Sequence, residues 1–233
     1  RHILEYFNPE HEELMVMLCG HPYIDVRNSL NSYVPKTIPN PLREKLVNEA
    51  LQYLREHPDS HDKLEFEVAT TCYTPFIDNR EKRWQSYGLN TDEICELKDH
   101  LLIHTEKLIR GEFYSIQDLT DRVRKLDIER KRLIKNADDL SSKNTVRDLL
   151  DICKTSGTIP FSSLARMAFI GSTFLKSFVE AKAITEDAYH EFLNSISTVA
   201  SEMGDNLEKV REGIITLETF LEEYGHLRPG TYE

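Results

Sequence analysis

The sequence has only four cysteines among its 233 residues, and they lie far apart. They are Cys19, Cys72, Cys95 and Cys153. Zinc knuckles need closely spaced pairs, and disulfide frameworks are typical of small extracellular domains, so neither is predicted. The spacing favours free thiols in a reducing compartment.

Long hydrophobic runs are also missing. The most apolar segment, residues 161–179, is interrupted by Arg166 and Lys176, so it falls short of the apolar length that spans a bilayer. No signal peptide opens the chain. These absences predict a cytoplasmic protein with no membrane partner.

Basic residues are in the minority, with 29 Lys and Arg against 40 Asp and Glu, which gives a formal net charge of −11. Proteins that bind a phosphate backbone depend on clustered Lys and Arg. The sequence shows no basic stripe with interleaved aromatic residues, so nucleic acid is not an expected partner.

Glycine-rich loops for phosphate binding are absent as well. Neither GxxxxGK[ST] nor GxGxxG occurs, and there is no GxSxG nucleophile motif. Internal repeats are not found. The motifs of the common nucleotide-binding and hydrolytic sites are therefore excluded.

The residues that are present can build a core, since 39% are hydrophobic and 21 are Phe, Tyr or Trp. Six of the nine prolines fall before residue 60. We predict strands at residues 24–34 and 64–73, where apolar residues partly alternate with polar ones. Between them, Pro41 is predicted to open a helix that ends before Pro58.

From Thr91 onward, apolar residues recur at helical spacing. One predicted helix runs from Thr91 to Gly111 and a second from Ile116 to Leu140, and the short link predicts an antiparallel hairpin. Further helices are predicted at residues 145–154, at 161–178 after a break at Ser156–Gly157, at 185–203, and at 207–224. Gly225 is expected to end the last one as a C′ residue. The predicted fold class is mainly α: a small α+β portion (1–80; two short strands and a helix) followed by a helical bundle (81–233).

Two features of the helices have an alternative chemical interpretation. His100 and His104 lie one turn apart, a spacing that could bind a metal with a third ligand, but His104 also lies on an apolar face, as an ordinary interior histidine would. The helix at 161–178 is rich in small residues. They could leave room for a ligand beside its aromatic residues, or simply allow tight packing, which we favour.

The C-terminal residues 224–233, YGHLRPGTYE, resemble the YGHxRPGxY[DE] segment of phosphoenolpyruvate-utilising phosphotransferases. This family includes proteins like phosphoenolpyruvate synthase and pyruvate phosphate dikinase. The rifampin phosphotransferases are a more distant likeness. They more often read YGHRGPGExD, so the Leu227–Arg228 pair and Thr231 depart from that pattern and argue against rifampin as the acceptor. Residues 25–35, DVRNSLNSYVP, and 63–73, KLEFEVATTCY, also resemble this group.

The resemblance implies a central helical domain of a longer enzyme. In that family, ATP with magnesium binds to a separate nucleotide-binding domain, and a histidine on a swivelling domain carries phosphate to the acceptor. Neither domain is recognisable in these 233 residues, so no catalytic residue, cofactor or metal is assigned to this chain. The implied partners are those two neighbouring domains and a small-molecule phosphate acceptor.

Candidate acceptor-binding residues come from the resembling segments. Arg228 can bind phosphate or carboxylate with a fork of donors, His226 can exchange a proton near neutral pH, and Glu233 ends the motif. Arg27, Asn28 and Asn31 form a second polar cluster. A structural alternative for the C-terminal motif is a helix cap and turn whose His and Arg bind backbone carbonyls.

The sequence thus predicts an acceptor-binding or linker domain of an ATP-dependent phosphotransferase, inactive on its own. The alternative is a non-catalytic helical scaffold that binds a protein partner or dimerises.

Overall fold

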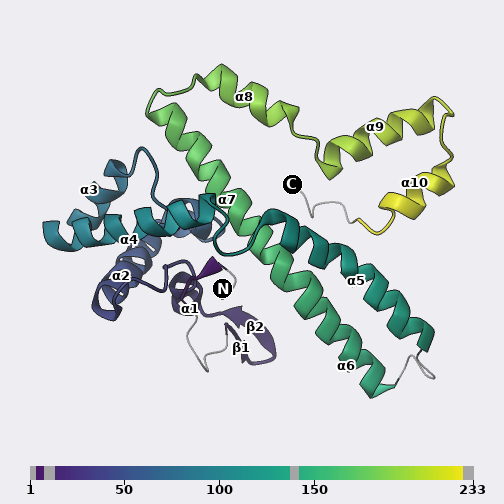
Figure 1. The fold of residues 1–233 in the computed structure, drawn as a ribbon, viewed down its shortest axis with the longest axis horizontal. Helices are drawn as coiled ribbons and strands as arrows, with labels where there is room; N and C mark the ends of the chain where they lie inside the picture. The colour runs from purple at the N-terminus through teal and green to yellow at the C-terminus, as the bar shows by residue number, and fades with distance from the viewer. Residues whose placement is uncertain (1–3, 8–13, 137–141, 228–233) are drawn as a thin grey trace. The chain divides into compact units, whose positions relative to one another are not determined.

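A computed structural model describes residues 4–7, 14–136 and 142–227. The chain divides into two compact units, Arg1–Ala181 and Lys182–Glu233. The described part is mainly helical and has one small antiparallel sheet near the N-terminus, so the predicted fold class is confirmed (Figure 1). No helix that the structure describes combines the length and apolar character needed to cross a membrane.

The sheet is a hairpin of β1 (Met15–Leu18) and β2 (His21–Ile24), in which Met15 lies opposite Ile24. Its turn residues Cys19 and Gly20 have φ angles of 51° and 81°, the left-handed values that a two-residue hairpin loop needs. The sheet ends at Ile24, the residue at which the first predicted strand begins.

The strand predicted at residues 24–34 is wrong. After β2 the chain forms α1 (Val26–Asn31), because the Asp25 carboxylate accepts a hydrogen bond from the backbone N–H of Asn28 and caps the helix. A helix places Arg27 and Asn31 on one face and turns Asn28 inward, an arrangement that a strand would not give.

The strand predicted at residues 64–73 is also wrong. Leu64–Val68 coils into a π-helical turn, η3, and the chain after it is extended but unpaired. Arginines from α3 (Asp78–Ser86) satisfy its carbonyls: Arg80 donates to those of Phe66 and Glu67, and Arg83 to those of Glu67 and Val68. Because side chains take these acceptors, no partner strand is required.

The helices around this segment follow the sequence closely. α2 (Asn40–Glu56) has Pro41 in its first turn and ends before Pro58, as predicted. α4 (Thr91–Ile109) begins at Thr91, as predicted, and a capping box between Asn90 and Glu93 fixes this start.

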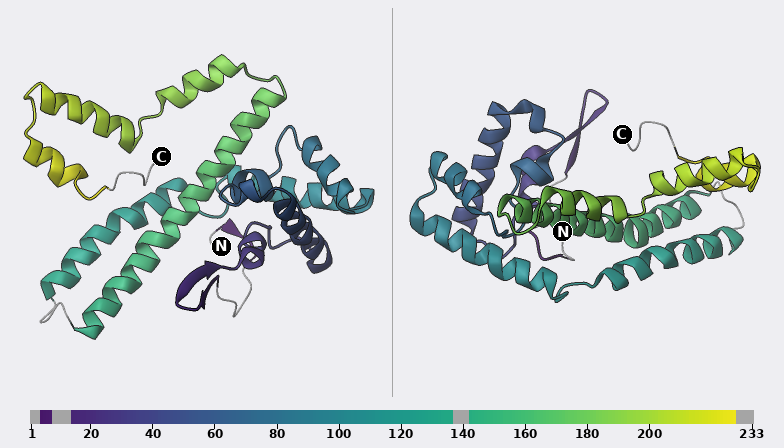
Figure 2. Two further views of the ribbon diagram at one scale, coloured as in Figure 1. Left: turned by 180° about the vertical axis from the view of Figure 1, so that it is seen from behind. Right: turned by 90° about the horizontal axis from the view of Figure 1, so that it is seen from above.

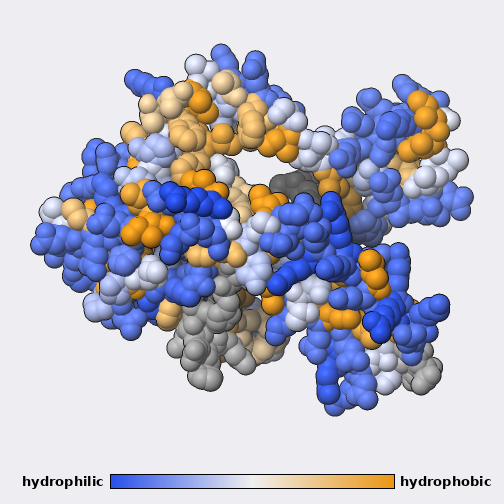
Figure 3. All heavy atoms as spheres, viewed as in Figure 1, coloured by the Kyte–Doolittle hydropathy of each residue, from blue (hydrophilic) through white to orange (hydrophobic). Residues whose placement is uncertain are grey.

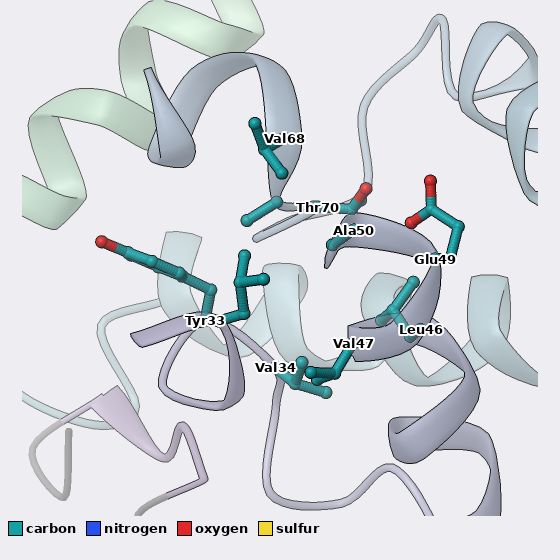
Figure 4. Close-up of a pocket in the computed structure, with 10 residues that line it drawn as sticks. Tyr33, Val34, Leu46, Val47, Glu49, Ala50, Val68 and Thr70 are labelled. Atoms are coloured by element: carbon teal, nitrogen blue, oxygen red, sulfur yellow. The ribbon is translucent and has the colours of Figure 1, made fainter. Parts of the chain in front are cut away.

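The main core lies between α1, α2, η3, α3 and α4. Its buried apolar residues include Leu30, Leu46, Val47, Trp84, Leu97 and Leu101. The predicted lead-in of residues 1–80 and the helices after residue 81 thus share one core. Figure 4 shows a gap in it beside Tyr33, Val68 and Thr70, with a volume of about 10 Å³, which is the space of a single water and too small for a ligand.

The hairpin predicted between the helices at 91–111 and 116–140 is wrong. α5 (Ile116–Asn136) continues roughly end to end from α4, as Figure 2 shows, and packs instead against α6 (Lys143–Ile152) and α7 (Ile159–Glu180). The break predicted at Ser156–Gly157 is also wrong, because Cys153–Thr158 forms a π-helical segment, η4, that joins α6 to α7.

The second unit contains α8 (Glu186–Ser195), α9 (Val199–Arg211) and α10 (Leu217–Tyr224). The helices predicted at 185–203 and 207–224 are each interrupted. Thr198 caps the start of α9, and Gly213, with a φ of 73°, separates α9 from α10. Gly225 is right-handed, with a φ of −63°, so its predicted C′ role is wrong.

Candidate functional site

One candidate site is a pocket between α1, its following turn and the start of α7. We call it the Arg166 pocket. Its volume is about 290 Å³, and it is lined by Leu4, Leu14, Ser29, Ser32, Tyr33, Thr158, Ile159, Ser162, Ser163 and Arg166. Six of these ten residues carry hydroxyl groups, and Arg166 is the only charged residue among the described residues that line the pocket.

Arg166 is held by the N-terminal segments of the chain. Its Nη1 donates a hydrogen bond of 2.6 Å to the backbone carbonyl of Ser32. Its guanidinium carbon lies 4.5 Å from the ring centre of Tyr33 and 4.7 Å from that of Tyr6. The two rings attract the cation through their π faces and fix its position.

The two tyrosines are themselves fixed by residues 63–73. The Tyr33 hydroxyl donates to the Glu65 carboxylate, and the Tyr6 hydroxyl donates to the Thr71 carbonyl at 2.8 Å. Burial, and then the hydrogen bond to Glu65 and its charge, raise the pKa of Tyr33 to about 12. Burial also raises the pKa of Tyr6, so both phenols are neutral near pH 7 and do not act as bases.

Arg166 has no carboxylate partner among the residues that the structure describes. In the ranges 4–7, 14–136 and 142–227, no Asp or Glu forms an ion pair with Arg166. A half-buried cation is normally paired, because removing a charge from water is costly. The pocket is therefore a favourable place for an anion.

The serines of the pocket present oxygen lone pairs. Ser32 Oγ donates to the Ser29 carbonyl at 2.6 Å, Ser162 Oγ to the Thr158 carbonyl at 2.7 Å, and Ser163 Oγ to the Ile159 carbonyl at 3.0 Å. Because each hydroxyl proton is already donated to a backbone carbonyl, these oxygens can accept hydrogen bonds from a ligand but cannot donate to it.

The small residues of α7 have different surroundings at its two ends. Near its C-terminal end, buried Ser177 accepts a hydrogen bond of 2.9 Å from the backbone N–H of Phe76, which agrees with the favoured prediction of packing. Near its N-terminal end, Ser162 and Ser163 line the pocket, but no aromatic residue of the helix is among its described lining residues.

The predicted cluster of Arg27, Asn28 and Asn31 is only partly formed. Arg27 and Asn31 line a shallow hollow of about 310 Å³, and Arg27 Nη1 donates to Asn48 Oδ1 at 2.9 Å. Asn31 Nδ2 donates to the Arg27 carbonyl at 3.1 Å. Asn28 is buried, with 5% of its surface exposed, so it supports the fold instead of lining the hollow.

The C-terminal candidates belong to the second unit. His226 is exposed just after α10, where the N–H of Leu227 bonds to the Tyr224 carbonyl at 2.9 Å. Arg228 and Glu233 lie outside the described residues. Tyr224, the first residue of the motif, is buried, and its hydroxyl accepts a hydrogen bond of 2.7 Å from Asn206.

The structure does not bring His100 and His104 together as metal ligands. His104 points into the core between Tyr6 and Phe113, with ring centres 4.6 and 5.3 Å away, and is only 3% exposed. Across the described ranges, no cluster of three His, Cys, Asp or Glu side chains could hold a metal ion. His104 is interior as expected, but its Nε2 has no hydrogen-bond partner among the described residues.

Sequence reasoning missed Arg166 as a site residue. The available signal was an arginine within the most apolar helix of the chain, since a charge in such a helix needs a specific partner. Comparison of the chain with known proteins finds no matching family model, no matching curated protein and no matching solved structure.

Proposed function

We propose that this chain is the central acceptor-binding domain of an ATP-dependent, phosphoenolpyruvate synthase-like phosphotransferase. The phosphoryl group would arrive on a phosphohistidine of a domain outside these 233 residues. The acceptor hydroxyl oxygen attacks the phosphorus, the phosphorus–nitrogen bond breaks, and the hydroxyl proton ends on the released imidazole.

The observation that carries the proposal is the composition of the Arg166 pocket. Two of the segments that resemble the phosphotransferase family meet there: residues 25–35 supply Ser29, Ser32 and Tyr33, and residues 63–73 supply Glu65, which holds Tyr33. Residues far apart in sequence therefore build one polar site beside a cation that has no carboxylate partner among the described residues, and a few convergent polar groups are a common feature of ligand pockets.

The residues of the pocket are suited to binding and not to chemistry. Within the part of the chain that the structure describes, the pocket wall includes no Asp, Glu, His, Lys or Cys that could serve as a base or nucleophile. A domain that binds the acceptor while another delivers the phosphoryl group needs no such residue.

The test uses the longer protein that this proposal implies. The reading frame is expected to encode a nucleotide-binding region before these residues and a phosphohistidine loop after them. In that protein, Arg166→Met should abolish phosphorylation of the acceptor and leave labelling of the histidine intact. Absence of both flanking regions would refute the proposal.

A scaffold role is a second candidate, favoured by exposed apolar side chains. Figure 3 shows hydrophobic surface in orange over α5 and α6. The exposed apolar residues of these two helices include Ile128, Val146 and Leu150. Others lie on the helices of the second unit, such as Val199, Leu217 and Leu221. Sedimentation of the 233-residue chain discriminates the two: a stable dimer at micromolar concentration favours the scaffold role.

A further inference from the structure

The charge of the Arg166 pocket limits the charge of its ligand. One guanidinium is the only ionised group on the pocket wall formed by described residues. A helix N-terminus often supplies a second positive contribution to a phosphate site. At the start of α7 it does not, because the helix continues from η4 and the N–H of Ile159 is bonded to the Lys154 carbonyl. A single negative charge matches this wall better than the double charge of a phosphate ester.

Arg166 has donors available for an anion. The tyrosine rings occupy the neighbourhood of the guanidinium carbon, and Nη1 already donates to Ser32. The other guanidinium N–H groups make no hydrogen bond to any residue that the structure describes. A planar fork of donors matches the oxygens of either a carboxylate or a phosphate, and the single positive charge on the described wall favours the carboxylate of the two.

The hydroxyl groups of the pocket require a ligand that donates hydrogen bonds. The oxygens of Ser32, Ser162 and Ser163 have their protons directed to backbone carbonyls, so they can only accept from a ligand. Donors on a small molecule are hydroxyl or ammonium groups. An ammonium group would need a carboxylate opposite it, and the described wall has none, which leaves hydroxyl groups.

The size of the pocket limits the ligand to a small molecule. A volume of about 290 Å³ is at the lower end of the range of roughly 300–1,000 Å³ typical of ligand pockets. A macrocycle does not fit such a space. Leu4, Leu14 and Ile159 supply the apolar part of the wall, against which a short carbon chain can pack.

From these four features we infer that the Arg166 pocket binds a hydroxylated monocarboxylate, a small acid with one carboxylate and one or more hydroxyl groups. The inference rests on the proposed role of this pocket as the acceptor site. The carboxylate pairs with Arg166, and the hydroxyl groups donate to the serine oxygens of α1 and α7. One of those hydroxyl groups is then the phosphoryl acceptor.

Binding to the 233-residue chain, measured by calorimetry, tests the inference without any phosphoryl transfer. The probes are lactate, glycerate and gluconate, compared with acetate, sorbitol and inorganic phosphate. We expect at least one hydroxy acid to bind about 10-fold more tightly than acetate or sorbitol, the effect of one or two added hydrogen bonds. Tighter binding of phosphate, or equal binding of acetate and every hydroxy acid, overturns the inference.

Three variants locate the binding. Arg166→Met should abolish it, Arg166→Lys should retain part of it, and Ser162→Ala should reduce the advantage of the hydroxy acid over acetate. Ser162 is exposed and its removal should not disturb folding, so it remains informative if the arginine variants unfold. The control is Arg147→Met on the exposed face of α6. Unchanged binding in Arg166→Met and Ser162→Ala contradicts the inference.

The proposed function can fail separately. If the chain binds a hydroxy acid through Arg166 but the longer protein does not phosphorylate it, the ligand class stands and the phosphotransferase role is wrong. If the longer protein phosphorylates an acceptor that lacks a carboxylate, the role stands and the ligand class is wrong.

Discussion

Arg166 differs from two other arginines of the first unit in its surroundings. Arg83 pairs with Glu49. Arg43, like Arg166, has no carboxylate partner among the described residues: it stacks 3.6 Å from the Phe7 ring centre and donates to the Ile38 carbonyl at 2.7 Å. Arg43 is 7% exposed, whereas Arg166 lines a pocket of about 290 Å³, and this access is why we assign Arg166 to a ligand.

His104 makes the stability of the first unit depend on pH. Burial, and then Lys107 and Arg166, lower the pKa of His104 from 6.5 to about 4. Between these values the unfolded chain binds a proton that the folded chain does not, so the free energy of unfolding falls as the pH falls from 6.5 to 4. This difference in pKa between the unfolded and the folded chain corresponds to about 3 kcal/mol of the free energy of unfolding.

Urea titrations between pH 7 and 4 test this effect. Over that range the free energy of unfolding of His104→Leu should fall by about 3 kcal/mol less than that of the unsubstituted chain, because the leucine side chain cannot bind a proton. His190→Gln, at an exposed histidine of α8, is the matched control and should follow the unsubstituted chain. Parallel curves for His104→Leu and the unsubstituted chain would show that this histidine is not held neutral by the fold.

The ion pair of Glu49 with Arg83 is the second prediction at this scale. The Glu49 side chain is 1% exposed and that of Arg83 is 13% exposed. Arg83→Met leaves a buried carboxylate without its cation, so we expect a loss of about 3–5 kcal/mol in the free energy of unfolding. Chemical denaturation provides the measurement.

The double variant Glu49→Leu/Arg83→Met shows whether the unpaired charge of Glu49 causes the stability loss of Arg83→Met. It should lose less stability than Arg83→Met alone, because no unpaired charge remains. Arg147→Met should change stability by less than about 0.5 kcal/mol. Equal losses in the single and double variants would instead assign the effect to the carbonyl bonds of Arg83.

Single elements were predictable where local residues decide them. Pro41 and the Asn90–Glu93 capping box mark the starts of α2 and α4, and both helices form as the sequence predicts. The two predicted strands failed because their backbone groups are satisfied by residues distant in sequence or by a short cap. Alternation of apolar residues cannot reveal such partners.

The site was less predictable than the elements. Arg166 and Ser32 are 134 positions apart, so neither the pocket nor its unpaired cation follows from local spacing. Arg27 and Asn31 were predicted as neighbours and are neighbours, although on a helix. The roles of His226, Arg228 and Glu233 remain predictions.

Two glycines of the second unit should respond in opposite ways to alanine. Gly204 lies in the interior of α9, and no atom lies within 4 Å of where its Cβ would be, so Gly204→Ala should stabilise the helix by about 0.5–1 kcal/mol. Gly213 has a φ of 73°, so Gly213→Ala should destabilise the turn by about 1–2 kcal/mol. Thermal unfolding followed by circular dichroism measures both, and shifts of the same sign would contradict the break between α9 and α10.

At the scale of the whole molecule, a core and a pocket coexist with exposed apolar surfaces. The first unit buries Trp84, Leu97 and Leu101 completely, whereas Tyr224 is the only buried residue among those described in the second unit. Large exposed apolar areas commonly mark surfaces that meet other protein. A central domain flanked by a nucleotide-binding domain and a phosphohistidine domain would have such surfaces.

The most direct test of the central claim is a single-turnover assay of the longer protein that the proposal implies, with phosphoryl transfer to the hydroxy acid that binds most tightly. With Arg166→Met, we expect the phosphohistidine to form at the normal rate and its transfer to the acceptor to fall by about 10²-fold or more, the scale of losing an oriented charged donor. Arg147→Met should transfer normally. Normal transfer by a folded Arg166→Met protein would contradict the assignment of this pocket as the acceptor site.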